Sequence, residues 1–90
     1  MYELKIKPDL DKRFKKMRKR ELGTLQIIDK KVQEIRQNPQ HYKNLRKPLE
    51  DWKSVHIFAH FVLVFSVDEN TKTVTLEDYD HHDYIYKKKR

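Results

Sequence analysis

Histidines are the residues of this chain best suited to acid–base chemistry, and two of them stand close to two tyrosines near the C-terminal end. His81 and His82 are followed by Tyr84 and Tyr86. In an extended chain alternate residues share a face, so His82, Tyr84 and Tyr86 would lie together. Histidine titrates near neutrality and can both take and give a proton. His82 is therefore a candidate functional residue, whereas His81 is expected to make a structural hydrogen bond.

The histidine spacing does not predict a metal site. His56 and His60 are four residues apart, about 13 Å of strand at ~3.3 Å per residue, so both cannot reach one ion. His81 and His82 are adjacent and would point to opposite faces of an extended chain. The sequence has no cysteine, which excludes disulfides and thiolate ligands and suggests a reducing cytoplasm. We therefore expect no metal and no other cofactor.

Positive charge is a second functional signal. Lysine and arginine number 21 against 14 aspartate and glutamate, so the formal net charge is +7. A positive field attracts polyanions, most often nucleic acid, although an acidic protein or an anionic membrane surface would be drawn as well. The sequence shows no signal-peptide pattern and no apolar run near the ~20 residues that span a bilayer. We expect a soluble intracellular protein with no membrane partner.

Much of this charge gathers on one predicted helix. Leu10, Phe14 and Met17 are spaced four and three apart, which predicts the buried stripe of a helix. The residues between them are mostly cations, and three are candidate contacts to RNA or to the ribosome: Lys12, Lys16 and Lys19. The alternative is a solvated helix surface without a partner.

The first half of the chain predicts a strand and two helices. Residues 2–7 alternate between apolar and polar types, as a half-buried strand does. Pro8 stops that strand, and Asp9 is expected to cap the following helix. Gly23, the only glycine, is expected to separate this helix from a second one that ends near Asn38. Two short amphipathic helices with a tight connection predict an antiparallel hairpin.

The second half predicts a polar loop followed by strands. Residues 40–52 are the loop, and residues 54–60 alternate as a strand does. Residues 61–67 are almost continuously apolar and predict a central strand covered on both faces. Residues 73–76 should return beside it, and residues 81–86 should add a short last strand. Because helices and strands are segregated, we expect one α+β domain over residues 1–90, with the helical hairpin on an antiparallel sheet of about four strands.

These segments, in this order, resemble the RelE/ParE superfamily of toxins. The run NPQHYKNLRKPLEDWKSVHI looks like the family's segment in which a helix ends at Asn-Pro and a basic loop leads into a strand. FVLVFSVDENTKTVTL looks like its central hairpin, and DHHDYIYKK resembles its closing motif. The resemblance implies an α+β fold and a cognate antitoxin whose tail wraps the toxin. For the RelE branch it also implies cleavage of messenger RNA on the ribosome, through metal-free attack of a ribose 2′-hydroxyl on the adjacent phosphate.

The resemblance also implies a set of site residues. Tyr86 matches the family's C-terminal tyrosine, and His82 stands where arginine is common. His56 falls where the sheet offers a second basic residue. We therefore expect His56 and His82 to be the acid–base pair and Tyr86 to stack on a base or orient the attacking hydroxyl. Phosphate contacts are expected from the helix cations named above and from Arg46, Lys47 and Lys53.

Two cations common in the family are absent. Ser54 and Val62 occupy their positions, and the valine removes an expected phosphate clamp. Two alternatives therefore stay open: a toxin of the same fold that inhibits a protein such as DNA gyrase, as the ParE branch does, and a decayed toxin that only binds its antitoxin. An antitoxin is also expected on physical grounds. Sheet edges and an apolar groove accept an added strand or an amphipathic helix, and the positive field favours an acidic tail.

Overall fold

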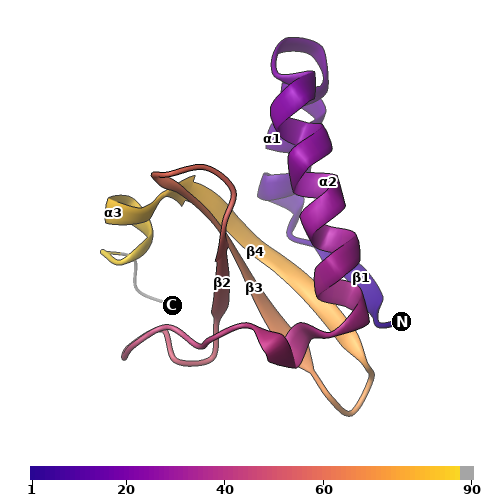
Figure 1. Ribbon diagram of the computed structural model, residues 1–90, viewed down its shortest axis with the longest axis vertical. Coiled ribbons are helices and arrows are strands. Elements are labelled where there is room, and N and C mark those ends of the chain that lie inside the picture. Colours follow the sequence, from indigo (N-terminus) through magenta and orange to yellow (C-terminus); the bar gives the residue numbers. More distant parts are fainter. Residues whose placement is uncertain (88–90) are drawn as a thin grey trace.

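The computed structural model describes residues 1–87 as a four-stranded sheet with a pair of helices on one face (Figure 1). The elements in chain order are β1 (Glu3–Ile6), α1 (Pro8–Arg20), α2 (Leu22–Gln37), a 3-10 turn (Pro39–His41), β2 (Lys53–His56), β3 (Phe61–Asp68), β4 (Thr73–His81) and α3 (His82–Ile85). The predicted α+β class and the helical hairpin against a four-stranded sheet are confirmed. Within the described residues, no helix combines the length and the apolar character needed to span a bilayer.

The strands lie in the order β1-β4-β3-β2, so β3 is central, as its apolar sequence predicted. β3 pairs antiparallel with both of its neighbours, whereas β1 runs parallel to β4. The sheet is therefore mixed, and the prediction that it is antiparallel throughout was wrong at β1. A parallel pair needs a long connection between its strands, and the helical hairpin belongs to that connection. β1 pairs only with Thr73–Leu76, so the second half of β4 extends beyond it.

The helical hairpin covers one face of the sheet through the larger of two cores. The stripe predicted on the first helix is buried, and α2 adds a second stripe spaced three and four apart. The buried members of this core are Leu10, Phe14, Met17, Leu25, Ile28, Val32, Ile35, Leu63, Phe65, Val74, Leu76 and Tyr79. Burial of these side chains is the main source of stability in a domain of this size.

A smaller core lies on the opposite face of the sheet. Val62 and Val64 alternate with the β3 residues of the larger core, so they point to the other side. The loop before β2 contributes Leu45 and Leu49, and α3 contributes Ile85. Trp52, partly buried at the end of the loop before β2, packs against this group. β3 is thus covered on both faces, as predicted.

The expected boundary of the first two helices was wrong in two details. α1 begins at Pro8 with Lys7 at its N-cap, and Asp9 lies in the first turn without capping it. Proline suits the first helical position, and a carboxylate in the first turn interacts favourably with the helix dipole. A single non-helical residue, Glu21, separates the helices, and Gly23 lies inside α2. No positive φ is needed there, so glycine's conformational freedom is not used.

The C-terminal part also differs from the prediction. β2 ends at His56, and residues 57–60 turn the chain into β3. β4 runs to His81 because its ladder with β3 continues to the pair Phe61–His81, past a bulge at Val64. The expected last strand is instead the helical turn α3. His81 caps this turn, because its Nδ1 accepts a hydrogen bond from the backbone N–H of Asp83. Of the cationic tail at residues 87–90, the last three residues lie outside the described part of the chain.

Candidate active site

A hollow of about 530 Å³ opens on the face of the smaller core. The loop before β2 lines it with four residues, β2 and the segment after α3 with one each: Lys43, Asn44, Leu45, Arg46, Ser54 and Tyr86. The hollow therefore joins the middle of the chain to its C-terminal segment. Tyr86 is 52% exposed, so its ring is accessible to a ligand. An accessible phenol opposite two cations is suited to a nucleotide, whose base can stack while its phosphate is neutralised.

Internal hydrogen bonds hold the loop that carries Arg46. The backbone N–H of Leu45 donates to the carbonyl of Trp52 at 2.8 Å, and the Asn44 amide donates to the carbonyl of Glu50 at 2.8 Å. Leu49 is only 1% exposed and anchors the far end of the loop in the smaller core. Arg46 is thus an exposed cation on a fixed backbone, which is the arrangement that a phosphate contact needs.

The single turn of α3 brings His82 and Tyr86 together. Ile85 is fully buried against β3, and the His82 N–H donates to the carbonyl of His60 at 2.8 Å. Residues four apart lie on one side of a helix. The rings of His82 and Tyr86 accordingly meet edge to face, with centroids 6.3 Å apart. The expected pairing of these two residues is present, although a helix rather than a strand produces it.

His56 lies farther away, at the exposed end of β2. It pairs with Val62, which pairs in turn with Asp80, so the three side chains share the face that holds the hollow. Two strand spacings put the backbones of His56 and Asp80 roughly 10 Å apart. His56 therefore stands across the width of this face from α3, on the same side of the sheet as His82.

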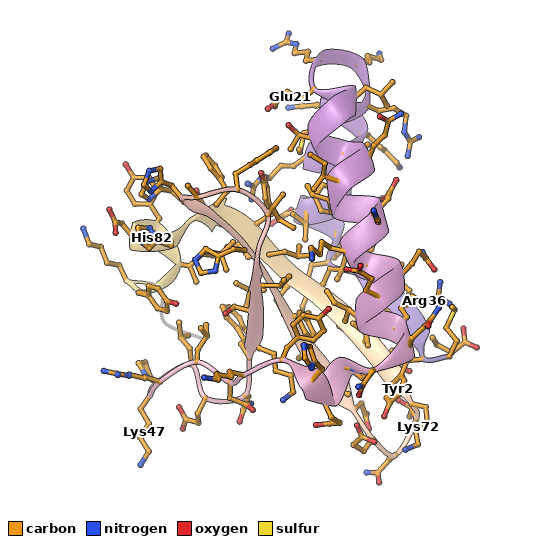
Figure 2. The ribbon with its side chains drawn as sticks, in the orientation of Figure 1. Tyr2, Glu21, Arg36, Lys47, Lys72 and His82 are labelled. Atoms are coloured by element: carbon orange, nitrogen blue, oxygen red, sulfur yellow. The ribbon has the colours of Figure 1, made fainter. Side chains whose placement is uncertain are left out.

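The predicted phosphate contacts divide between the two faces. Of the six, Arg46 lines the hollow. Lys47 projects outward from the loop (Figure 2). Lys53 donates to the Tyr42 carbonyl and to the Asn44 side chain, both at 3.0 Å, and its strand partner Phe65 belongs to the larger core. The helix cations are exposed on α1, across the sheet from the hollow: Lys12, Lys16 and Lys19.

The departures from the family pattern have a structural explanation at one position. Val62 is fully buried in the smaller core and packs where an arginine would need to reach the surface. Ser54, by contrast, lines the hollow. Sequence reasoning missed Asn44 and Lys43 as lining residues, although the segment that resembles the family pattern includes a basic loop. That loop composition was the one available signal.

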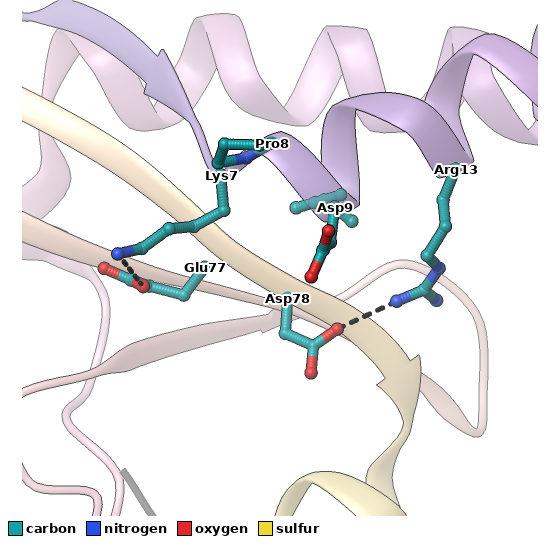
Figure 3. Close-up of a pocket in the computed structure, with 7 residues that line it drawn as sticks. Lys7, Pro8, Asp9, Arg13, Glu77 and Asp78 are labelled. Atoms are coloured by element: carbon teal, nitrogen blue, oxygen red, sulfur yellow. Dashed lines mark hydrogen bonds and ion pairs between the residues drawn. The ribbon is translucent and has the colours of Figure 1, made fainter.

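A second hollow, about 470 Å³, lies where β1 gives way to α1 (Figure 3). Two ion pairs bridge it: Arg13 to Asp78 at 2.9 Å and Lys7 to Glu77 at 3.7 Å. Arg13 also donates to the Tyr79 carbonyl on the part of β4 that β1 does not cover. We interpret this hollow as structural, because its charged groups hold α1 against the sheet.

Comparisons with known proteins agree with this architecture. No protein-family model matches the chain. A Methanocaldococcus jannaschii protein named 'Putative toxin RelE4' is 61% identical over 90 residues, which is all of this chain and 96% of that protein. An uncharacterized protein of Methanosarcina mazei is 56% identical over 86 residues, 96% of this chain and all of that one.

Two solved structures of toxins show the same fold. The YoeB-YefM complex from Staphylococcus aureus matches with a TM-score of 0.76 at 17% identity, over 91% of this chain and 98% of the other. A YoeB/ParE toxin from Agrobacterium tumefaciens matches with a TM-score of 0.77 at 12% identity, over 89% and 98%. At these identities the likeness concerns the fold alone.

Proposed function

Because the chain belongs to the RelE-like toxins of toxin–antitoxin systems, we propose that it is an endoribonuclease that cuts messenger RNA on the ribosome and so stops translation. The observation that carries the proposal is the hollow in which Arg46 and Lys43 face Tyr86, with His82 beside that tyrosine. Its place of action is the cytoplasm, where translation occurs.

The proposed reaction needs no metal. The ribose 2′-oxygen forms a bond to the adjacent phosphorus, and the bond from phosphorus to the 5′-oxygen breaks. A base takes the proton of the 2′-hydroxyl, and an acid gives a proton to the leaving 5′-oxygen. The products are a 2′,3′-cyclic phosphate and a 5′-hydroxyl. Cations that contact the phosphate stabilise the extra charge of the transition state.

Each role has a candidate residue. Tyr86 stacks on a base or orients the attacking hydroxyl, and His82 beside it takes the proton. Arg46 and Lys43 contact the phosphate from the loop. His56, across the face, delivers the proton to the leaving oxygen. The cations on α1 face away from this hollow, so their role would be to attract ribosomal RNA.

The test is expression of the full chain without antitoxin, with cleavage mapped on ribosome-bound message in a cell-free translation system. His82→Ala and Tyr86→Ala should each lower the cleavage rate by at least about 10²-fold, the usual contribution of a positioned acid or base. His41→Ala is the matched control, because His41 is exposed in the 3-10 turn and does not line the hollow. If wild-type protein cuts no message, or His82→Ala cuts it equally well, the proposal is wrong.

A second candidate function is inhibition of a protein target such as DNA gyrase. The buried Val62 favours it, because Lys43 and Arg46 are then the only cations among the described residues that line the hollow. A supercoiling assay separates the two: inhibition of gyrase without RNA cleavage would support the second function. A decayed toxin would neither cut RNA nor inhibit gyrase, and it would still bind its antitoxin.

We also propose a cognate antitoxin as partner, and a third hollow of about 440 Å³ suits it. Phe58 and Phe61 are 44% and 38% exposed there, next to Met17 and Tyr79. Burial raises the pKa of Tyr79, and the charge of Glu21 adds to the shift while Arg13 opposes it. Cations of α1 border the same groove: Arg13, Lys16 and Arg20. An apolar floor with a cationic rim fits an acidic amphipathic segment.

A further inference from the structure

Three histidines gather where β4 passes into α3. His60 and His81 stack with ring centroids 5.5 Å apart, and His82 lies 5.0 Å from His81 and 6.0 Å from His60. One ring nitrogen from each of the three lies within 4.8 Å of the others. His60 is exposed and the other two are half-buried, so the cluster opens to solvent.

The backbone explains why the sequence did not reveal this cluster. His81 ends β4 in an extended conformation, whereas His82 begins a helix, so their side chains do not point to opposite faces. The His82 N–H donates to the carbonyl of His60 at 2.8 Å, which fixes the turn at residues 57–60 against α3. His56 does not belong to the cluster; the partners of His60 are His81 and His82.

The carboxylate of Asp83 lies beside two of these histidines, in the position from which a carboxylate would accept a hydrogen bond from a metal-bound histidine. Its Oδ1 lies 3.4 Å from Nδ1 of His82, and its Oδ2 lies 3.7 Å from Nδ1 of His81. The Nδ1 of His82 is buried and makes no hydrogen bond within the described residues. Metal-bound histidines usually donate their second ring nitrogen to a carboxylate, which orients the ring. A buried nitrogen left without such a bond marks an arrangement that ligand binding would complete.

We propose that His60, His81 and His82 bind a divalent transition-metal ion that prefers imidazole ligands, such as zinc. In the metal-bound form His82 is a ligand, so it does not serve there as the base of the proposed metal-free reaction. Three histidines with an open fourth position form an established type of zinc site. Tetrahedral ligands about 2.0–2.1 Å from zinc lie roughly 3.3 Å from one another, so the imidazoles must move closer. The exposed side chain of His60 can make most of this movement by rotation, while its backbone stays bonded to the His82 N–H.

His81 needs one tautomeric change to take part. Its Nδ1 now accepts the backbone N–H of Asp83 at 3.2 Å, so in the neutral ring the proton lies on Nε2. Transfer of that proton to Nδ1 leaves Nε2 for the metal. The hydrogen bond from the Asp83 backbone N–H to Nδ1 is then lost, and Nδ1–H donates instead to the Asp83 carboxylate, whose Oδ2 lies 3.7 Å away. No net proton is gained or lost in this change.

Titration of the untagged full chain with ZnCl₂ by calorimetry, and with CoCl₂ by visible absorption, tests the proposal without any measurement of activity. We expect one ion per chain and the strong visible bands of tetrahedral Co²⁺. His60→Ala should weaken zinc binding by at least about tenfold, since loss of an outer partner alone already costs 10–100-fold. Asp83→Asn removes such an outer partner and should weaken zinc binding by about tenfold, the lower end of that range.

His41→Ala is the matched control, because it also removes one exposed histidine but leaves the cluster intact. Its zinc affinity should equal that of the wild type, and circular dichroism should show that all variants are folded. Equal weakening by His41→Ala and His60→Ala would overturn the proposal, because the ion would then bind surface histidines in general. A wild-type dissociation constant above about 1 mM, near −4 kcal/mol of binding, would overturn it as well.

Discussion

The two faces of the sheet are built from the same strands but hold together differently. On one face, two helices bury a continuous core whose members recur at helical spacing. On the other, a loop and one helical turn cover a core of five buried residues, and the exposed polar groups gather around it. Val62 and Leu63 are neighbours in the chain and serve opposite faces. Stability is therefore concentrated on the helical face, and candidate chemistry on the other.

The contrast has a physical basis. Regular elements bury apolar area efficiently because their side chains recur on one side. Loops and element ends leave backbone and polar side chains exposed, which is why binding and catalytic residues are often found there. α3 combines both properties, since fully buried Ile85 anchors a turn whose other residues are accessible. Substitutions that act on one face and spare the other test this comparison.

The largest difference should appear between two matched leucines. Leu63 is fully buried in the larger core and Leu49 is 1% exposed in the smaller one. We expect Leu63→Ala to lower the free energy of unfolding by about 4–5 kcal/mol and Leu49→Ala by about 2–3 kcal/mol, because a loop collapses into the cavity more readily than a central strand does. Urea unfolding measures both. Equal losses would contradict a division of stability between the faces.

Ile85→Ala should have a smaller effect on stability and a larger one on chemistry. Removal of this buried anchor should cost about 2 kcal/mol, at the lower end of the range for such truncations. The turn that pairs His82 with Tyr86 should then open locally. Relative to the wild type, hydrogen exchange should become faster at the Tyr86 amide and stay unchanged in α2. RNA cleavage should fall by at least tenfold. Unchanged exchange in α3 would show that other contacts hold it.

The cations on α1 should affect long-range attraction and leave stability almost unchanged. Replacement of Lys12, Lys16 and Lys19 by glutamine lowers the formal net charge from +7 to +4, a difference of three. The free energy of unfolding should change by less than about 0.5 kcal/mol. Binding to ribosomes should lose part of its salt dependence. An unchanged salt slope would indicate that these lysines are only solvated surface.

The smallest effect should come from the polar end of the β3–β4 hairpin. Lys72 donates to Glu69 at 2.9 Å, and Tyr2 and Gln40 also donate to this carboxylate. These hydrogen bonds lower the pKa of Glu69 below its usual 4.5, and the bond from Lys72 has the largest effect. A carboxyl group whose pKa is lower in the folded than in the unfolded protein stabilises the fold at pH values above its unfolded-state pKa. This stabilisation is lost as the pH falls through its folded-state pKa.

Glu69→Gln should therefore lower the melting temperature slightly at neutral pH. The difference from wild type should shrink as the pH falls below about 4.5, because both side chains are then uncharged. Thermal melts from pH 3 to 7 measure it. A difference that grows toward acid pH would show that the carboxylate does not act through its charge.

The sequence by itself determined the elements whose residues repeat with a regular period. The stripe of Leu10, Phe14 and Met17 and the apolar run of β3 gave the helices, the central strand and the α+β class, because periodicity decides which side chains can be buried together. It also indicated Tyr86, His82 and Arg46 as neighbours of one site. Those residues lie on segments that the family pattern brings to one face.

Only the tertiary structure decided what depends on the ends of elements and on strand pairing. Side chains alternate between the two faces along β2, and this alternation places Lys53 on the face away from the hollow. Val62 is fully buried, so its role is in packing. The passage from strand to helix between His81 and His82 brings three histidines together. No local sequence pattern encodes this passage from strand to helix. It depends on how far β4 pairs with β3 and on the burial of Ile85 in the smaller core.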